Sequence, residues 1–185
     1  ERPPVVVASS LGGHIAMLAA LRSPSAFAGL QLVSPGGLHR PPLATRMMAR
    51  AYYSERSILK RGDDDIVSNS RKIFARASEQ RERLIARKLT VHRSPLRQTF
   101  ARPFSRVVDD VFNHPVASRV HKLKLPVSFV HGQKDPIVPI GPCERAARRA
   151  GARFLLLADI GHLPMVEATD SFARLVFDFA SEVGA

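Results

Sequence analysis

Three residue types that together carry out acyl transfer occur in this chain, beginning with a serine in a tight turn. Ser10 lies in the segment Ala-Ser-Ser-Leu-Gly, with the small residues Ala8 and Gly12 two positions before and after it. This spacing is typical of a nucleophile elbow, in which a strained turn between a strand and a helix exposes the serine hydroxyl. The backbone N–H of Leu11, at the start of that helix, would stabilise the oxyanion of a tetrahedral intermediate.

An aspartate and a histidine follow two later apolar segments. Asp135 lies in His-Gly-Gln-Lys-Asp-Pro after residues 125–131, and His162 lies in Asp-Ile-Gly-His-Leu-Pro after residues 153–158. In a Ser-His-Asp mechanism Ser10 attacks the acyl carbon and His162 takes and returns the proton. Asp135 then fixes the tautomer of the histidine and stabilises its protonated form.

Each of the three residues also has a purely structural interpretation. Ser10 could be the remnant of an elbow that no longer reacts, and Asp135 could serve only as a turn residue before Pro136. His162 could be a turn histidine that is hydrogen bonded to the backbone. The sequence favours the catalytic interpretation because all three roles fall at the ends of expected strands.

The remaining polar clusters indicate neither a metal site nor a cofactor. We expect His14 and His131 to be packed histidines and the carboxylates of residues 63–65 to be solvated in a loop. No histidine stands at a metal-ligand spacing from Cys143. The glycines at 12 and 13 lack the further glycine and lysine of a phosphate-binding loop.

Composition excludes several classes of protein. Hydrophobic residues make up 45 % and charged residues 24 % of the 185, which is typical of a folded globular domain and not of a disordered or low-complexity chain. The longest apolar runs, residues 3–8 and 15–21, are shorter than the roughly 20 residues of a membrane span. One cysteine cannot form an internal disulfide, so a reducing compartment, the cytoplasm or the mitochondrion, is favoured.

The elements that must position these residues alternate between strand and helix at both ends of the chain. We expect strands at 5–7, 29–33, 125–131 and 153–158 and helices at 11–21, 141–150 and 167–183. This order predicts an α/β fold with a parallel sheet of about four strands. Catalytic groups in such sheets follow the C-terminal ends of the strands.

Between the second and third strands we expect a basic, mostly helical insertion. Residues 36–124 contain 20 Lys or Arg against 8 Asp or Glu, a net charge of +12, and the rest of the chain is neutral. The longest expected helix, residues 70–89, carries the four anion-binding candidates Arg71, Arg76, Arg83 and Arg87. Contact with RNA or an anionic membrane surface is one interpretation, and a solvated basic surface is the other.

The sequence resembles the α/β-hydrolase fold family, of the esterase and lipase-like type with a helical cap. The resemblance is carried by Ser-Leu-Gly-Gly-His, Pro-Val-Ser-Phe-Val-His-Gly-Gln-Lys-Asp-Pro and Gly-His-Leu-Pro-Met-Val-Glu, and by the chain order Ser, Asp, His. It covers residues 3–35 and 119–183 and corresponds to the C-terminal two thirds of the family. It implies a hydrolase core formed by residues 1–35 and 119–185, with a cap at 36–118.

The family's earlier strands have no counterpart in this chain. Val5, Val6 and Val7 would therefore form an exposed sheet edge, and we expect a further chain or an N-terminal segment to cover it. The resemblance also implies a second oxyanion donor from an early loop. Loss of one such donor typically lowers the rate about 10²- to 10³-fold.

Two function classes follow from these observations. The first is a serine hydrolase that acts on a small acyl substrate, through an ester, thioester or related acyl bond, and is incomplete as this chain. The second is a non-catalytic subunit derived from a hydrolase, which contacts RNA or anionic lipid through residues 36–124 within a larger assembly. The intact Ser-Asp-His set favours the first class, and the basic insertion favours the second.

Overall fold

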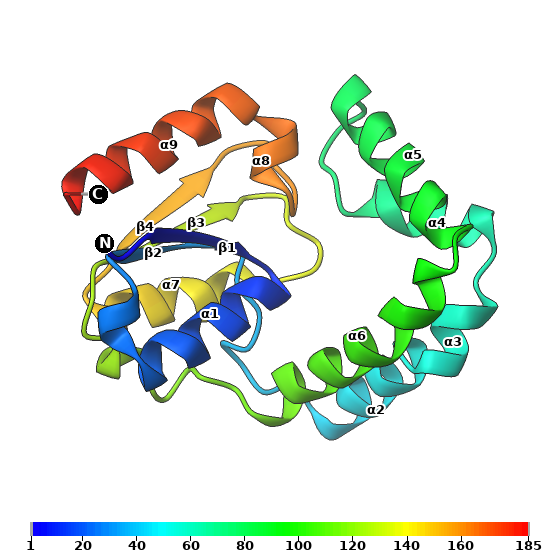
Figure 1. Cartoon of the computed structure of the whole chain (residues 1–185), viewed down its shortest axis with the longest axis horizontal. Helices are drawn as coiled ribbons and strands as arrows, with labels where there is room; N and C mark the ends of the chain where they lie inside the picture. The colour runs from blue at the N-terminus through cyan, green and yellow to red at the C-terminus, as the bar shows by residue number, and fades with distance from the viewer. Residues whose placement is uncertain (1, 185) are drawn as a thin grey trace.

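A four-stranded parallel sheet forms the centre of the molecule (Figure 1). The computed structural model describes residues 2–184. The strands lie in chain order: β1 (Val5–Ser9), β2 (Gly29–Val33), β3 (Val127–Gly132) and β4 (Arg153–Leu157). All four expected strands are present, and the prediction of a parallel α/β sheet is confirmed.

The inner strand β2 is buried along its whole length, as its apolar sequence requires. Leu32 is paired with Ala8 of β1 on one side and with Phe129 of β3 on the other. The polar exception is Gln31, whose side-chain amide donates a hydrogen bond of 3.1 Å to the backbone oxygen of Leu175. This bond connects the sheet to the C-terminal helix.

Helices cover the two faces of the sheet unequally (Figure 1). Helices α1 (Leu11–Arg22) and α7 (Ile140–Ala150) lie on one face with the larger apolar core, which includes Met17, Leu32 and Phe129. On the other face the C-terminal helix α9 (Thr169–Glu182) packs Phe172 against Val33 and Val130. Two short 3₁₀ helices, η1 (Pro24–Ala26) and η2 (Val120–Lys122), complete the connections around the sheet.

A short helix that the sequence did not predict precedes the expected C-terminal helix. The helix predicted at 167–183 is α9, and Ala168, with a non-helical backbone (φ −143°, ψ 53°), separates it from the short helix α8 (Pro164–Glu167). Because of this break, α8 lies beside the loop that carries His162. Glu167, the last residue of α8, contacts the site described below.

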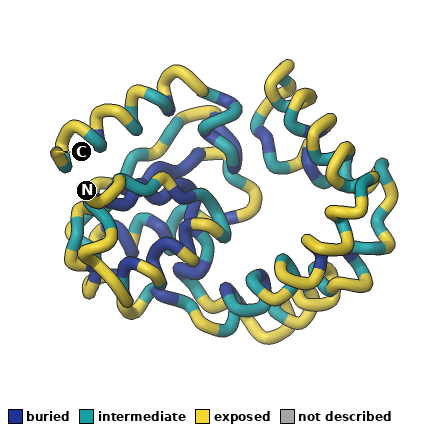
Figure 2. The backbone as a smooth tube through the Cα atoms, in the orientation of Figure 1, coloured by how far each residue is buried: buried dark blue, intermediate teal, exposed yellow. Residues whose placement is uncertain are grey.

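Five helices form an arc beside the sheet, within the segment 36–118 that we call the cap (Figure 1). They are α2 (Leu43–Tyr52), α3 (Glu55–Lys60), α4 (Asp63–Lys72), α5 (Glu79–His92) and α6 (Leu96–Asn113). Among the described residues this segment contains no strand, as expected. Buried residues are concentrated around the sheet and are sparse along the arc (Figure 2).

The prediction of a single helix over residues 70–89 is wrong. Helix α4 ends at Lys72 and α5 begins at Glu79, and the hydroxyl of Ser78 caps α5 by accepting a bond from the N–H of Arg81 (3.1 Å). The backbone of residues 73–75 instead forms hydrogen bonds with the loop that follows β4. The longest cap helix is α6, with 18 residues.

Strand β1 is an edge of the sheet, as the sequence predicts. Within residues 2–184 it pairs only with β2, and Val7 is 41 % exposed. An open apolar edge of this kind invites pairing with another strand. No helix among the described residues has the length and hydropathy that a membrane crossing requires.

Candidate active site

Ser10 occupies a strained turn between β1 and α1. Its φ of 53° and ψ of −119° are unusual for a residue with a side chain and cost on the order of 1–3 kcal/mol. Backbone bonds hold this conformation: the Ser10 N–H donates to the oxygen of Val33 (2.9 Å), and the Ser10 oxygen accepts from the N–H of Gly36 (2.9 Å). The turn between strand and helix expected from the sequence is present.

The glycine that this turn requires is Gly13 and not Gly12. A Cβ on Gly13 would lie 2.7 Å from the Cβ of Pro35, so a side chain would push the start of α1 away from the loop after β2. A Cβ on Gly12 would meet no atom of the described residues within 4 Å. The elbow pattern in the sequence predicts instead that the small residue is Gly12, because Gly12 stands two positions after Ser10.

Asp135 and His162 form a buried hydrogen-bonded pair at the ends of β3 and β4. Nδ1 of His162 lies 2.8 Å from Oδ2 of Asp135, and the two side chains are 7 % and 0 % exposed. The other carboxylate oxygen accepts bonds from the backbone N–H groups of Ile137 (2.8 Å) and Val138 (3.1 Å). Burial alone would raise the pKa of Asp135, but the bonds from His162 and from these two N–H groups hold that pKa below its ordinary value.

His131 lies behind this pair and is buried, as expected of a packed histidine. Its Nε2 is 3.8 Å from Oδ2 of Asp135, and its Nδ1 is 2.9 Å from the backbone oxygen of Gly132. His14 is also buried, with Nε2 3.4 Å from Oδ2 of Asp110. Burial lowers the pKa of His14 more than its contact with Asp110 raises it.

Glu167 fixes the loop of His162 against the cap, a role that the sequence analysis did not assign. One carboxylate oxygen accepts a bond from the N–H of Gly161 (2.9 Å), and the other accepts from the N–H of Ala75 (2.8 Å). The N–H of His162 itself donates to the backbone oxygen of Ile73 (2.8 Å). The only signal in the sequence is a glutamate five residues after His162, and this spacing does not indicate which groups it contacts.

Ser10 and His162 line one cavity of about 450 Å³. Leu11, at the first position of α1, lines it as well, so the N-terminal end of that helix faces the same space. The cap contributes apolar side chains from α6 (Val108, Val111 and Phe112). The structure thus joins Asp135 to His162 and brings Ser10 and His162 to one cavity, and their catalytic roles stay a prediction.

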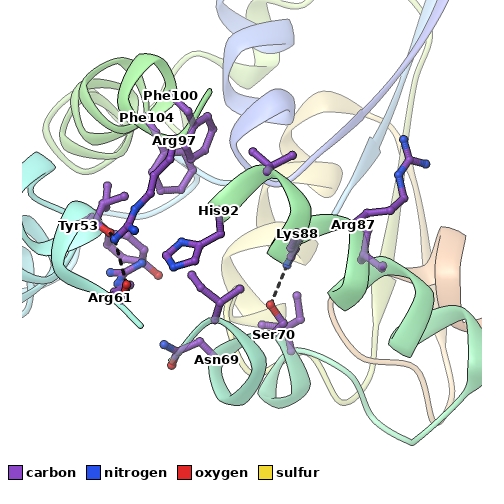
Figure 3. Close-up of a pocket in the computed structure, with 15 residues that line it drawn as sticks. Tyr53, Arg61, Asn69, Ser70, Arg87, Lys88, His92, Arg97, Phe100 and Phe104 are labelled. Carbon is purple, nitrogen blue, oxygen red and sulfur yellow. Dashed lines mark hydrogen bonds between the residues drawn. The ribbon is translucent and has the colours of Figure 1, made fainter. Parts of the chain in front are cut away.

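A second cavity of about 580 Å³ lies within the cap, among α3, α4, α5 and α6 (Figure 3). Four residues line both cavities: Tyr53, Ile73, Lys88 and Phe104. The set of residues around either cavity contains no aspartate or glutamate. The second cavity could not be predicted from the sequence, because it depends on how four helices pack.

The four anion-binding candidates do not share one helix. Arg71 lies on α4, Arg76 lies in the connection after it, and Arg83 and Arg87 lie on α5. Arg71 is paired with Glu82 (3.2 Å) and Arg83 with Glu79 (2.6 Å), while Arg76 donates to the backbone oxygen of Glu167 (3.3 Å). Contact of the cap with RNA or anionic lipid stays a prediction.

No candidate metal site is present among the described residues, in which no group of three His, Cys, Asp or Glu side chains could hold an ion. Asp63 forms an ion pair with Arg93 (2.6 Å) at the start of α4, where a carboxylate also interacts favourably with the helix dipole. Cys143 is fully buried in α7, and burial raises its pKa to about 12.

Comparison with known proteins agrees with this architecture. Residues 1–168 match the model of the family described as serine aminopeptidase, S33. The chain is 23 % identical over 197 residues to monoacylglycerol lipase abhd6-B of Xenopus laevis and 21 % identical over 189 residues to monoacylglycerol lipase ABHD6 of Mus musculus. Each alignment covers 99 % of this chain and 56 % of the relative, so the chain spans little more than half the length of these relatives.

Solved structures of similar fold include two hydrolases. A meta-cleavage product hydrolase from Pseudomonas fluorescens superimposes with a TM-score of 0.75 at 20 % identity, over 99 % of this chain and 66 % of its own. A thermophilic esterase from Thermogutta terrifontis gives a TM-score of 0.70 at 23 % identity, over 98 % of this chain and 65 % of its own. These likenesses show that the fold is that of the α/β-hydrolases.

Proposed function

Because the chain belongs to the serine aminopeptidase S33 family of α/β-hydrolases, we propose that it forms part of a serine hydrolase that cleaves an ester, thioester or related acyl bond. The observation that carries the proposal is the buried pair of Asp135 and His162, placed on the cavity that Ser10 also lines. A structural histidine needs neither a fully buried carboxylate on Nδ1 nor a position on the wall of an apolar cavity beside a strained serine.

In the proposed reaction the Ser10 hydroxyl attacks the acyl carbon while Nε2 of His162 removes its proton. Asp135 keeps Nδ1 of His162 protonated and stabilises the imidazolium that forms. The backbone N–H of Leu11 donates to the oxyanion. His162 then protonates the leaving group, and a water molecule activated by the same nitrogen hydrolyses the acyl-enzyme.

We further propose that the segment or chain covering the edge of β1 completes the machinery. The exposed Val7 marks where a strand would pair, and the second oxyanion donor would come from the same part of the whole protein. The apolar side chains around both cavities suit an aliphatic acyl chain. The names of two relatives, monoacylglycerol lipases, agree with a substrate of this kind.

The test is covalent labelling of the whole gene product with a fluorophosphonate probe, which reacts with an activated serine. We expect labelling of the native protein and its loss in Ser10→Ala. Ser9→Ala is the matched control, because Ser9 is the adjacent residue and its buried hydroxyl has no hydrogen-bond partner among the described residues. Folded native protein that resists the probe would contradict the proposal and favour a non-catalytic role.

A further inference from the structure

The two cavities meet at a lysine that has no counterion among the described residues. Lys88 on α5 lines both the cavity of Ser10 and the cavity within the cap. Its Nζ donates one hydrogen bond, to the hydroxyl of Ser70 on α4 (3.3 Å, Figure 3). Within residues 2–184 it forms no ion pair, although an ammonium group has three protons to donate.

The two glutamates of α5 itself are paired with arginines. Glu82 is paired with Arg71 and Arg81, and Glu79 is paired with Arg83. Burial lowers the pKa of Lys88, as expected for an ammonium group that is partly removed from water. The described residues therefore place a basic side chain at the junction of two largely apolar cavities and supply no anion to it.

The other basic residues around the cap cavity are engaged or directed elsewhere. Arg97 donates to the backbone oxygens of Ile58 and Arg61, and Arg61 stacks over the ring of Tyr52 at 4.2 Å. Arg87 is exposed, and Figure 3 shows its guanidinium extending away from Ser70. Among the residues that line both cavities, Lys88 is the basic one.

From these contacts we propose that Lys88 binds an anionic group, a carboxylate or a phosphate, on the acyl chain of the substrate. This inference rests on the proposed function, because it places the ester carbonyl at Ser10 and the acyl chain across the junction of the cavities. The enzyme would then prefer acyl esters that carry a negative charge at a distance from the bond it cleaves. A charge-assisted bond in a cavity without acidic residues would supply that preference.

The preference is measured with a matched series of p-nitrophenyl esters and the whole gene product. The neutral ester is p-nitrophenyl octanoate, and the charged esters are the mono-p-nitrophenyl ester of octanedioic acid and the p-nitrophenyl ester of 8-phosphonooxyoctanoic acid. We expect a higher kcat/KM for at least one charged ester than for the neutral one. The better charged ester identifies whether carboxylate or phosphate is the group bound.

Three variants separate charge from structure. Lys88→Met should lower kcat/KM for the preferred charged ester on the order of 10- to 100-fold more than it lowers kcat/KM for the neutral ester. Lys88→Arg keeps the positive charge and should restore part of the preference. Lys72→Met is the control, because Lys72 is exposed at the end of α4 and lines neither cavity.

Equal losses for charged and neutral esters in Lys88→Met would overturn the inference and show that the lysine stem only packs against apolar surface. A binding measurement gives an answer even if no ester is hydrolysed. Ser10→Ala protein should bind octanedioate more tightly than octanoate by calorimetry, and adding Lys88→Met should abolish the difference. Failure of the proposed function appears as no fluorophosphonate labelling, whereas failure of this inference appears as the absence of any preference for the dicarboxylate.

Discussion

The sheet region, with its covering helices, and the cap are stabilised by different interactions, and we infer that the two regions have different functions. Around the sheet, fully buried apolar residues such as Leu32 and Phe129 hold the strands, and buried side chains are concentrated there (Figure 2). The cap helices bury few side chains completely and are joined largely by ion pairs and bonds to backbone oxygens, such as those of Arg93 and Arg97. A densely packed region holds atoms at fixed distances, whereas a sparsely packed one can vary.

The chemistry and the selectivity follow this division. Ser10, Asp135 and His162 belong to turns at the ends of strands, where backbone hydrogen bonds fix them. The walls that a substrate would meet come mainly from cap helices, including Lys88 on α5 and Phe104 on α6. We infer that changes in the sheet region affect the rate of the reaction and that changes in the cap affect the choice of substrate.

The largest expected effect comes from Asp135→Asn in the sheet region. The amide oxygen can still accept the two backbone bonds, but the amide nitrogen would face Nδ1 of His162 and favour the wrong tautomer. In the proposed mechanism kcat should fall on the order of 10⁴-fold, with little change in substrate preference. Steady-state kinetics of the whole gene product on p-nitrophenyl octanoate would measure both.

Asp159→Asn provides the control for that prediction. Asp159 also follows β4, but it is exposed, is paired with Lys134 (2.6 Å) and lines neither cavity. We expect this variant to retain the native rate. A similar loss of rate in both variants would mean that Asp135 acts only through the stability of the sheet edge.

The sequence was a good guide to the sheet because its signals are local. Short β-branched and apolar runs ended by glycine or by turn residues predict β2 with its observed bounds, and they place Ser10, Asp135 and His162 after strands. The same local reasoning could not locate the break between α4 and α5. Residues 73–75 leave the helix to bond with His162 and Glu167, some ninety positions away, and such a contact leaves no periodic pattern in the sequence.

Lys88 illustrates the same limit for the candidate site. On sequence alone it is one of many basic residues in a segment of net charge +12, and the candidates chosen there were arginines expected on one helix. What sets Lys88 apart is helix packing, which partly buries it beside Ser70 and leaves it without a carboxylate partner among the described residues. The sequence therefore predicts the strands of the fold, but it does not predict which side chains line the cavity.

A smaller effect is expected at the contact that joins the two regions. Glu167→Gln replaces one accepting oxygen by an amide nitrogen, so either Gly161 or Ala75 loses the acceptor for its N–H group. A buried donor without a partner costs about 1–3 kcal/mol in the free energy of unfolding. Urea unfolding should show this loss, and kcat should fall because the loop that holds His162 is less restrained.

Glu144→Gln is the matched control for Glu167, because Glu144 on α7 is partly exposed and its carboxylate is paired with Arg148 four residues away (3.2 Å). It should leave the rate unchanged. If Glu167→Gln altered the preference between charged and neutral esters and left kcat unchanged, the contacts of Glu167 would position the cap and not His162. That result would assign Glu167 to substrate choice together with the cap, and not to the reaction rate together with the sheet region.

The smallest expected effect is local to the cap and tests whether the two regions open separately. Ser78→Ala removes the N-cap of α5, a change that typically costs about 1 kcal/mol. If the cap opens on its own, amide hydrogens of α5 should exchange about five times faster, since one kcal/mol changes an equilibrium by about that factor. Amide hydrogens of the buried strand β3 should keep their rates, because they exchange only when the sheet itself unfolds. Acceleration of β3 by the same factor would mean that sheet and cap unfold as one cooperative unit, and the separation of rate from substrate choice would then lose its physical basis.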